Sequence, residues 1–521
     1  EPDPRPALLF GVTGSGKTQV YMRLIQKVLE EGKQAIVLIP EIALTFQTVM
    51  RFYNRFGDRV SIMNSRLSPG ERFDQFERAK NGDVDIMIGP RSALFTPFSK
   101  LGLIIIDEEH ESSYKSETLP RYHARETAIE RARMCGASVV LGSATPSVES
   151  YYKAKIGEYE LLELKHRVAE KPLPKVEVVD LREELKAGNR SILSVQLQEL
   201  MEDRLKKGQQ MMLFINRRGV AGFVSCRACG HVLKCPHCDV SLSQHVTRQH
   251  PEGKMVCHYC GYEIPMPKTC PACGSRYISG FKAGTQKIEM IVKERFPQAR
   301  VLRMDMDTTR NKEGYEQILS AFANQEADIL IGTQMIVKGH DFPDVTLVGI
   351  LAADLSLNAD DYRSGERTFQ LLTQAVGRAG RGRKEGHALI QTYSPDHYSI
   401  QTAAKQDYEE FYQEEMGYRL LMDYPPAAHM MAVLGSSEDE KLLETAMHYL
   451  GLFTGKIYAG KDLHVIGPAP ASVGKVKDVY RRVLYLKHEN YDLLVRIKDR
   501  LEEYIEINSG FRKVNIQFDF S

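Results

Sequence analysis

The sequence predicts an α/β protein in which two lobes built on parallel sheets are followed by a C-terminal α+β domain. Three observations support this prediction: short apolar runs alternate with longer amphipathic stretches, this alternation occurs twice, and the pattern changes after residue 400. Strands that run in the same direction need a crossover between them, and an amphipathic helix usually supplies it. A cysteine-rich stretch interrupts the second series, so we expect a small insert in lobe two.

The first series of strands begins at residue 7 and ends near residue 165. Its apolar runs are ALLF, AIVLIP, VDIMIG, LGLIIID and ASVVLGSA, each followed by a longer stretch with helical periodicity. This pattern is typical of a parallel sheet covered by helices. We therefore expect lobe one over residues 1–165.

A linker rich in proline and charge, AEKPLPKVEVVD, separates the first series from the second. The second series contains MMLFINRRG, ARVLRMD, ADILIGTQ, VTLVGILAAD and GHALIQTY. The expected boundaries are residues 166–222 for the first part of lobe two, 223–277 for the zinc-binding insert, 278–405 for the rest of lobe two, and 406–521 for the C-terminal domain.

Composition limits the classes of partner and compartment. The 521 residues hold 69 Lys and Arg against 68 Asp and Glu, so any nucleic-acid surface must be local. Apolar runs fall short of the roughly 20 residues that a membrane span needs, so no membrane association is expected. The chain opens on EPDPRP without Met, as a fragment or processed product would, and no signal peptide is visible. We expect a cytoplasmic protein whose cysteines bind metal rather than form disulfides.

The segment GVTGSGKT lies between the strand-like ALLF and the helical QVYMRLIQKVLEEG. Glycines allow backbone N–H groups to surround a phosphate at a helix N-terminus. Lys17 would reach the β- and γ-phosphates, and Thr18 would ligate Mg²⁺. A glycine-rich turn that matches by chance is the alternative. The predicted nucleotide-binding residues are Gly11, Val12, Thr13, Gly14, Ser15, Gly16, Lys17 and Thr18.

The apolar strand in LIIIDEEH ends in acids that would complete this site. Asp107 would join the Mg²⁺ shell, and Glu108 would polarise the attacking water. Acids that only solvate a strand end are the alternative. The complete phosphate loop upstream favours the catalytic interpretation.

The segment QAVGRAGR, residues 374–381, would supply arginines from the second lobe. Arg378 and Arg381 would stabilise charge on the γ-phosphate in the transition state, which would link lobe closure to hydrolysis. Because they are three residues apart, we expect them on one helix face. An exposed basic helix is the alternative.

These motifs, together with GSATPS, FINRRG and IGTQMIVKGHDFPDV, have the order and spacing of superfamily-two helicases, whose two lobes are RecA-like. With DEEHESSYK, RYHARETA and four Cys-x-x-Cys pairs added, the chain from residue 7 onward resembles the PriA family of bacterial replication-restart helicases. The resemblance implies a 3′→5′ DNA helicase and DNA-stimulated ATPase that recognises stalled forks and initiates primosome assembly. The implied cofactors are ATP with Mg²⁺ and two structural Zn²⁺.

The same resemblance implies the partners. These are single-stranded and forked DNA, single-strand-binding protein and primosome or helicase-loader proteins, and we expect the chain to act as a monomer. The family's N-terminal DNA-binding region is not part of the resemblance. The family usually has Glu and Phe where this sequence has Gln19 and Ala427.

Aromatic and cationic residues alternate in HESSYKSETLPRYHARET, as a contact that stacks on bases and pairs with phosphates requires. In the resembling family this aromatic-rich loop links DNA binding to ATP hydrolysis. A polar loop that closes over the sheet edge is the alternative. The candidate DNA-coupling residues are Tyr114, Lys115, Arg121, Tyr122 and His123.

Eight of the nine cysteines form four Cys-x-x-Cys pairs, and 18 residues separate the two inner pairs, as in a zinc ribbon. Nested pairing is the more compact arrangement and the one the resemblance implies. A sequential arrangement, first four and last four, stays open. Cys135 is expected in the core. In the nested arrangement zinc 1 is held by Cys226, Cys229, Cys270 and Cys273, and zinc 2 by Cys235, Cys238, Cys257 and Cys260.

Four thiolates close each predicted site, so both zinc ions should be structural and should supply most of the insert's folding free energy. The insert would serve as a platform for partner proteins or for the duplex at a fork junction. A staple that only stabilises lobe two is the alternative.

The C-terminal segment GKVKDVYRRVLYLK fits a nucleic-acid strand and a solvated sheet face equally well. Its cations and aromatics are Lys475, Lys477, Tyr480, Arg481, Arg482, Tyr485 and Lys487.

The combined interpretation is an ATP-dependent DNA translocase of the PriA type. Two alternatives stay open: a scaffold for loading the replicative helicase whose motor is dispensable, and another superfamily-two nucleic-acid translocase. The intact nucleotide motifs favour a motor over a scaffold, and the two-zinc insert argues against the other translocases.

Overall fold

The structure is a computed structural model that describes residues 5–65, 67–167, 173–216, 224–245, 253–280, 284–305, 308–309, 312–337, 342–359, 361–382, 384–458, 460 and 462–521. The chain forms two compact units. The first consists of residues 1–175, 334–345 and 374–386, and the second of residues 176–333, 346–373 and 387–521. Arg217 to Gly219 of FINRRG and residues 338–341 of IGTQMIVKGHDFPDV lie outside the described residues.

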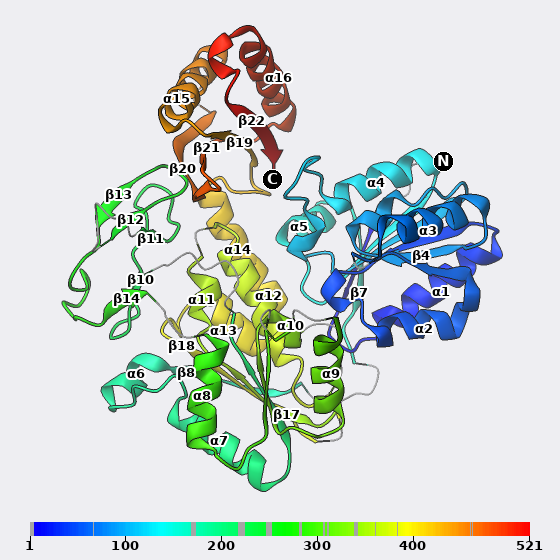
Figure 1. The fold of residues 1–521 in the computed structure, drawn as a ribbon, viewed down its shortest axis with the longest axis vertical. Coiled ribbons are helices and arrows are strands. Elements are labelled where there is room, and N and C mark those ends of the chain that lie inside the picture. Colours follow the sequence, from blue (N-terminus) through cyan, green and yellow to red (C-terminus); the bar gives the residue numbers. More distant parts are fainter. Residues whose placement is uncertain are drawn as a thin grey trace. The chain divides into compact units, whose positions relative to one another are not determined.

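A seven-stranded sheet forms the centre of the first unit, and every strand pairs in parallel with its neighbours (Figure 1). Its inner strands are almost wholly apolar, as expected where helices cover both faces of a parallel sheet. In sheet order the strands are β3 (Val60–Ile62), β4 (Ile86–Gly89), β2 (Gln34–Leu38), β5 (Leu101–Asp107), β6 (Ser138–Ser143), β1 (Ala7–Gly11) and β7 (Glu160–Leu164).

Helices within residues 5–167 follow the strands of this sheet in sequence, and residues 334–345 add one more helix to the unit. The first helix buries Tyr21, Met22, Ile25 and Leu29, a spacing that places all four on one face toward the sheet. The helices of this unit are α1 (Lys17–Glu30), α2 (Phe46–Phe56), α3 (Pro69–Asn81), α4 (Ala124–Cys135), α5 (Val148–Lys155) and α10 (Gln334–Val337).

A six-stranded sheet forms the centre of the second unit. Parallel registers join β15 to β16, β16 to β9 and β17 to β18. The two parallel-sheet, RecA-like lobes that the sequence predicts are thereby confirmed. In sheet order the strands are β15 (Val301–Met304), β16 (Ile329–Gly332), β9 (Gln210–Phe214), β17 (Val345–Ile350), β18 (His387–Thr392) and β8 (Lys175–Asp180).

Helices of the second unit accompany this sheet, and apolar side chains at positions 197, 201, 288, 292 and 355 form its core with the strands. They are α6 (Leu181–Lys186), α7 (Val195–Lys206), α8 (Thr285–Arg295), α9 (Lys312–Ala323), α11 (Asp354–Leu357), α12 (Ser364–Val376), α13 (Tyr398–Lys405) and α14 (Tyr408–Leu421).

Two small antiparallel sheets carry the cysteine-rich insert. Strand β10 (Val224–Cys226) pairs with β14 (Ile278–Gly280), and β12 (Lys254–Val256) lies between β11 (Ser243–His245) and β13 (Glu263–Pro265). The insert's apolar core includes Tyr362 from lobe two and Tyr424 and Met430 from the C-terminal part of the chain. This packing adds apolar burial to the folding free energy that zinc would supply.

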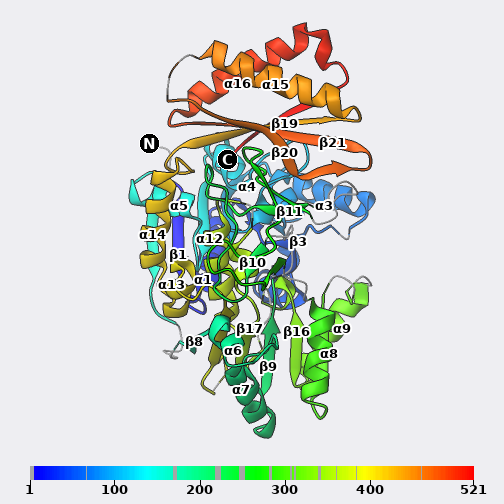
Figure 2. The same ribbon diagram turned by 90° about the vertical axis from the view of Figure 1, so that its left-hand side faces the viewer.

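The C-terminal domain is a four-stranded antiparallel sheet with two helices on one face, as both views show (Figures 1 and 2). This arrangement confirms the predicted α+β class. The strands are, in sheet order, β20 (His464–Val476), β21 (Val479–His488), β19 (His429–Ser437) and β22 (Asn515–Phe520), and the helices are α15 (Glu440–Ile457) and α16 (Tyr491–Ile507).

Two sequence-based expectations about local structure are wrong. Cys135 is exposed at the end of α4 rather than buried in the core. Helix α12 ends at Val376, so Arg378 and Arg381 lie in the turn that follows and do not share a helix face. Gly380 bends the chain here with a left-handed φ of 69°, and a Cβ on it would lie 2.5 Å from the Gly386 nitrogen.

Membrane insertion has no support in the described part of the chain, because none of its helices combines the length and apolar character that crossing a bilayer demands.

Candidate nucleotide and zinc sites

The predicted phosphate loop connects the carboxyl end of β1 to the first residue of α1. Gly16 caps the helix with a left-handed φ of 88°, a conformation that residues with a Cβ rarely adopt. The Lys17 ammonium folds back and donates to the Gly11 carbonyl at 2.7 Å, and the Ser15 N–H donates to the Val12 carbonyl at 3.0 Å. The loop therefore places a lysine and a helix N-terminus at one point, which is the arrangement that binds phosphate.

The loop also contains a buried polar atom that a ligand could satisfy. Ser15 Oγ is buried and has no hydrogen-bond partner among the described residues. A buried hydroxyl without a partner is costly, and a phosphate oxygen would relieve that cost. The residues of the loop thus fit the triphosphate of a nucleotide.

Asp107 ends β5 at the same sheet edge, because parallel strands place their carboxyl ends together and Asp107 is in register with Gly142 of β6. Tyr21 of α1 donates its hydroxyl to Asp107 Oδ1 at 2.9 Å. Burial raises the pKa of Asp107 to about 6 and the charge of Glu108 adds to this rise, while Lys17 and Tyr21 oppose it. A part-buried carboxylate at the same sheet edge as the phosphate loop fits a Mg²⁺ ligand beside the phosphates.

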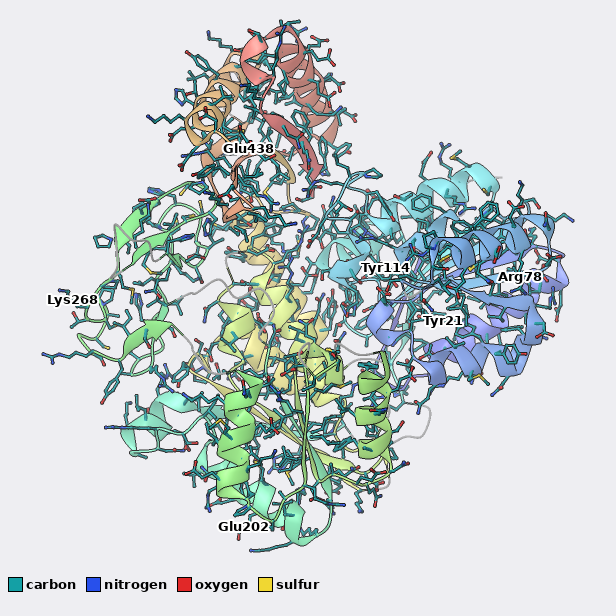
Figure 3. All side chains as sticks on the ribbon, viewed as in Figure 1. Tyr21, Arg78, Tyr114, Glu202, Lys268 and Glu438 are labelled. Carbon is teal, nitrogen blue, oxygen red and sulfur yellow. The ribbon has the colours of Figure 1, made fainter. Side chains whose placement is uncertain are left out.

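Tyr21 is a site residue that the sequence reasoning missed (Figure 3 labels it). It is only 2% exposed, and a Cβ on Gly142 would lie 1.7 Å from its hydroxyl oxygen. The glycine that opens GSATPS is therefore required for the tyrosine to reach Asp107. The available signal was its position four residues after Lys17, which places both on one side of the helix.

Glu108 follows Asp107 with φ 49°, a left-handed conformation that is strained for a residue with a Cβ. Its side chain remains 32% exposed, and Oε2 lies 3.7 Å from His110 Nδ1. The sharp bend after the strand directs Glu108 away from the sheet. It is therefore accessible to a water molecule, as a catalytic base requires.

His110 connects the acidic motif to two other motifs in the first unit. The Gln374 side-chain amide lies 2.8 Å from His110 Nε2, and His110 Nδ1 lies 2.7 Å from Ser143 Oγ, so each ring nitrogen has a hydrogen-bond partner. The Gln374 that begins QAVGRAGR and the Ser143 of GSATPS thereby contact the same imidazole. The three motifs lie far apart in the sequence, which gives no indication of this link.

Glu109 is fully buried in a hydrogen-bonded network that also escaped the sequence reasoning. Its carboxylate accepts from the Ser147 N–H at 2.6 Å, from Ser150 Oγ at 2.8 Å, and from Arg125 at 3.3 Å. Burial lowers the pKa of Arg125, but the negative charges of Glu126 and Glu109 outweigh this and raise it. Arg125 is therefore held as a cation between the acidic motif and helix α5.

The aromatic-rich loop does not present Tyr114 to solvent, so the expectation that this residue stacks on bases is wrong. Tyr114 is 1% exposed, and its hydroxyl donates to the carbonyls of Asp107 at 2.7 Å and Leu38 at 3.0 Å (Figure 3). The ring packs beside β5, and burying its apolar surface stabilises the fold more than an exposed ring would. Tyr114 therefore supports the acidic motif from inside.

The other loop candidates lie nearer the surface. Tyr122 is half-buried, with its ring edge-on to the exposed Phe95 at 5.3 Å. Lys115 donates to the Arg121 carbonyl at 3.5 Å, and His123 caps α4 by accepting from the Arg125 N–H. These four residues share the loop, and Tyr122 is the aromatic ring that a base could reach.

The two arginines of QAVGRAGR belong to the first unit together with the phosphate loop. Arg381 Nε donates to the Gly377 carbonyl at 2.9 Å. Burial lowers the pKa of Arg167, which follows β7, and the positive charge of Arg381 adds to that effect. Arg167 and Arg381 thus place positive charge in the same unit as the phosphate loop.

The cysteine sulfurs gather into two groups that match the nested pairing. Within each group the four sulfur atoms lie within 4.8 Å of one another. The outer group contains Cys226, Cys229, Cys270 and Cys273, and the inner group contains Cys235, Cys238, Cys257 and Cys260.

Sulfur separations identify the ligand that these groups fit. Cys226 and Cys273 are 3.7 Å apart, and Cys235 and Cys260 are 3.5 Å apart. A disulfide would bring the sulfurs to about 2.0 Å, whereas Zn–S bonds of about 2.3 Å in a tetrahedron separate them by about 3.8 Å. The geometry therefore fits two zinc ions and excludes disulfides between these atoms.

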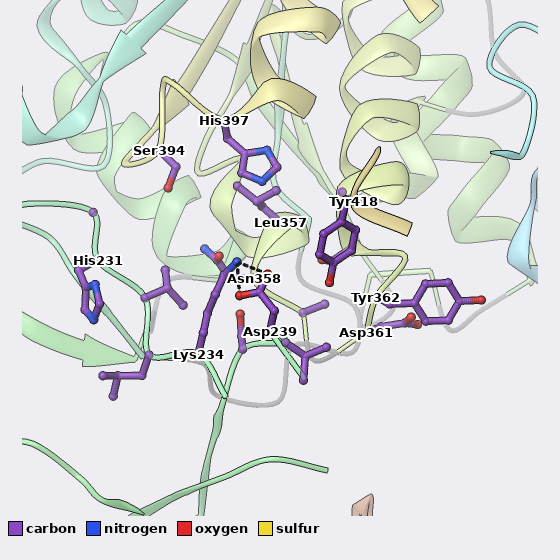
Figure 4. Close-up of a pocket in the computed structure, with 18 of the residues that line it drawn as sticks. His231, Lys234, Asp239, Leu357, Asn358, Asp361, Tyr362, Ser394, His397 and Tyr418 are labelled. Carbon is purple, nitrogen blue, oxygen red and sulfur yellow. Dashed lines mark hydrogen bonds and ion pairs between the residues drawn. The ribbon is translucent and has the colours of Figure 1, made fainter. Parts of the chain in front are cut away.

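A separate cavity of about 530 Å³ lies within the second unit, between the insert and lobe two (Figure 4). Lys234 and Asp239 form an ion pair at its edge, 3.2 Å apart. Burial lowers the pKa of His397 to about 4, with Lys234 adding to the effect, so this ring is neutral at pH 7. The phosphate loop and the acidic motif contribute no residue to the cavity lining.

The basic segment of the C-terminal domain contains both exposed and buried side chains. Lys477 and Arg481 are exposed near the β20–β21 turn. Lys487 is 5% exposed, and the ring of Tyr485 lies 4.8 Å from that of Tyr259 in the insert. Only the exposed part can contact nucleic acid.

Sequence families match the chain in four consecutive parts. Residues 4–154 match DEAD/DEAH box helicase, 235–265 match the PriA DNA helicase Cys-rich region domain, 277–383 match the helicase conserved C-terminal domain, and 421–520 match the primosomal protein N C-terminal domain.

Curated relatives match almost the whole chain. Replication restart protein PriA of Bacillus subtilis is 49% identical over 99% of this chain and 63% of its own length. Proteins of the same name from Haemophilus influenzae and Treponema pallidum are each 39% identical, over 97% and 98% of this chain and 68% and 77% of their own lengths. The chain thus spans less than two thirds of the Bacillus relative.

Proposed function

The chain belongs to the PriA family of replication restart proteins, and from this premise we propose that it is an ATP-dependent DNA translocase with 3′→5′ polarity. It would act at stalled or branched forks and restart replication by initiating primosome assembly. Single-stranded and forked DNA, single-strand-binding protein and helicase-loader proteins would be its partners. The observation that carries the motor part of the proposal is the convergence of Lys17, Asp107 and Glu108 at one sheet edge.

Each residue of this convergence would have a distinct task. Lys17 would leave the Gly11 carbonyl to neutralise phosphate charge, and the left-handed Gly16 would aim the following N–H groups at the same oxygens. Thr18 and Asp107 would hold Mg²⁺, with Tyr21 fixing the orientation of Asp107 through its hydroxyl. When bound, ATP with Mg²⁺ would supply the phosphoanhydride bond whose hydrolysis releases the free energy for movement.

Water activation would fall to Glu108, because its strained backbone holds a partly exposed carboxylate next to the part-buried Asp107. Arg378 and Arg381 would stabilise negative charge as the bond breaks. A movement of the acidic motif would be transmitted through His110 to Gln374, since one imidazole contacts both segments. The half-buried Tyr122 of the aromatic-rich loop would sense the DNA strand.

The test is ATP hydrolysis by the purified chain with and without single-stranded DNA. We expect DNA-stimulated hydrolysis that Lys17→Ala abolishes, because the substitution removes the loop's ammonium. Glu108→Gln should still bind ATP but hydrolyse it very slowly, since the amide cannot accept a proton. Hydrolysis by Glu108→Gln at the wild-type rate would show that the base has been misassigned.

The scaffold alternative makes a different prediction for the same variants. If loading of the replicative helicase is the needed activity and the motor is dispensable, Lys17→Ala should lose hydrolysis yet still assemble loader proteins on forked DNA. Assembly that fails together with hydrolysis supports a motor that is required.

A further inference from the structure

The inner cysteine group is covered by the C-terminal domain. Lys487 projects from β21 and is 5% exposed, with its ammonium 3.6 Å from the centre of the Tyr424 ring. The same ammonium donates to the Met422 carbonyl at 3.0 Å. Tyr424 in turn donates its hydroxyl to the backbone carbonyl of Cys238 at 3.2 Å. A short chain of contacts thus joins the lysine to the inner site.

The second cysteine pair of the inner site, Cys257 and Cys260, also lies against the C-terminal domain. His258 and Tyr259 lie between Cys257 and Cys260, and both are buried. His258 Nδ1 donates to the Pro470 carbonyl of β20 at 3.1 Å, while the Tyr259 and Tyr485 rings are 4.8 Å apart. Both halves of the inner site therefore meet the same antiparallel sheet.

Charge explains why a buried lysine is found here. Four thiolates around one Zn²⁺ leave a net charge of about −2, which is costly in an apolar surrounding unless cations or donors offset it. A lysine buried without a counter-charge would be costly for the same reason. Burial does lower the pKa of Lys487, to about 8, while the charges of Cys238 and Asp423 act to raise it. The buried lysine and the thiolates of the inner site therefore each offset part of the burial cost of the other.

We propose that Lys487 is the counter-charge of the inner zinc site, so that zinc binding there and docking of the C-terminal domain stabilise each other. This inference rests on zinc binding by the inner cysteines. Thermodynamic linkage makes the effect reciprocal: removal of the lysine weakens zinc retention, and removal of the zinc loosens the domain. The outer site packs on lobe two through the Arg227–Tyr393 hydrogen bond. Zinc binding at the outer site is therefore not coupled to docking of the C-terminal domain.

The first experiment measures zinc retention in the full chain. Zinc content and its release to a chelator are followed for wild type, Lys487→Met, Lys487→Arg and Lys477→Met. Differential alkylation with mass spectrometry identifies which cysteines become reactive. Outer-shell partners of a metal site typically contribute about 10–100-fold in affinity. We expect Lys487→Met to weaken retention of one zinc by about tenfold or more and to expose the inner cysteines first.

The two other variants separate charge from side-chain shape. Lys487→Arg keeps the cation and should retain zinc better than Lys487→Met. Lys477 is an exposed lysine on the same hairpin, so Lys477→Met should match wild type. If Lys487→Met retains both zinc ions as wild type does, the counter-charge proposal is overturned. If wild type itself binds no zinc, the assignment of the cysteines as zinc ligands is refuted instead.

The second experiment tests the reverse direction. Hydrogen exchange of β20 and β21 amides is compared between wild type, a Cys235→Ser/Cys238→Ser variant and a Cys226→Ser/Cys229→Ser control. We expect faster exchange in these strands only when the inner site is lost. Equal exchange in all three proteins would refute the linkage.

If Lys487→Met does not fold, Tyr424→Phe tests the contacts that join the lysine to the inner site. It keeps the ring below the ammonium and removes only the hydroxyl that reaches Cys238. We expect inner-zinc release to be severalfold faster in this variant. Unchanged release would count against the proposal.

Discussion

Substitution of Tyr114 tests whether this residue supports the acidic motif or contacts DNA. The side chain is 1% exposed and its hydroxyl donates to two backbone carbonyls, one of them that of Asp107. Tyr114→Ala should cost about 3–5 kcal/mol, as other buried aromatic truncations do. At about 2–4 °C per kcal/mol, the unfolding temperature of the first unit should fall by about 6–20 °C. Tyr114→Phe keeps the ring and should cost about 1–3 kcal/mol, because buried carbonyls lose their donor.

Thermal unfolding followed by calorimetry, together with ATP hydrolysis with and without single-stranded DNA, provides the assay. Loss of support for Asp107 should reduce basal and DNA-stimulated hydrolysis alike. Tyr122→Ala is the matched control, since this half-buried ring should affect DNA stimulation more than stability. An unchanged unfolding temperature in Tyr114→Ala, combined with selective loss of DNA stimulation, would refute the supporting role and restore the stacking interpretation.

Three further substitutions test other parts of the structure. Arg381→Ala should reduce hydrolysis by about 10³-fold with nucleotide binding retained, measured by turnover and by binding of a fluorescent nucleotide; a loss of only a few-fold would mark a surface arginine. Glu109→Gln should lower the free energy of unfolding by about 1–3 kcal/mol, because the donors on Ser147, Ser150 and Arg125 lose a buried carboxylate acceptor while Arg125 keeps its ion pair with Glu126, and a urea midpoint equal to that of wild type would contradict the network. Arg419→Met should destabilise the second unit by about 3–5 kcal/mol, since the Arg419 guanidinium is wholly buried against Glu366 at 2.5 Å and Glu415 at 2.9 Å. Unchanged hydrogen exchange in α12 and α14 would show that these ion pairs do not stabilise the unit.

The parts of the candidate site that follow from the sequence are those in which adjacent residues determine the geometry. The phosphate loop needs its glycines, lysine and threonine in one unbroken run, so the motif could be recognised before any fold was known. The acids after LIII follow from the same reasoning, because a buried strand must end where charge begins. The two parallel sheets follow from the alternation of strands and helices.

Contacts between distant segments could not be predicted in this way. Tyr21 reaches Asp107 across 86 residues, and Gln374 reaches His110 across 264 residues. Tyr114 was predicted as a DNA contact because aromatic and cationic neighbours surround it in sequence. Its burial depends instead on Leu38, which is 76 residues away. Local composition describes a loop's chemistry but not the face that it turns inward.

The cysteines show which features the local sequence determines and which depend on tertiary packing. The sequence by itself determined that four Cys-x-x-Cys pairs would bind metal, because each pair makes a tight turn whose two sulfurs point to one centre. Which pairs share a centre was decided by the tertiary structure, which brings Cys226 within 3.7 Å of Cys273 and Cys235 within 3.5 Å of Cys260. The structure likewise decided that Lys487 faces the inner site and not solvent. Periodicity and turn geometry depend on a few neighbouring residues, whereas pairing and burial depend on the free energy of packing segments far apart in the chain.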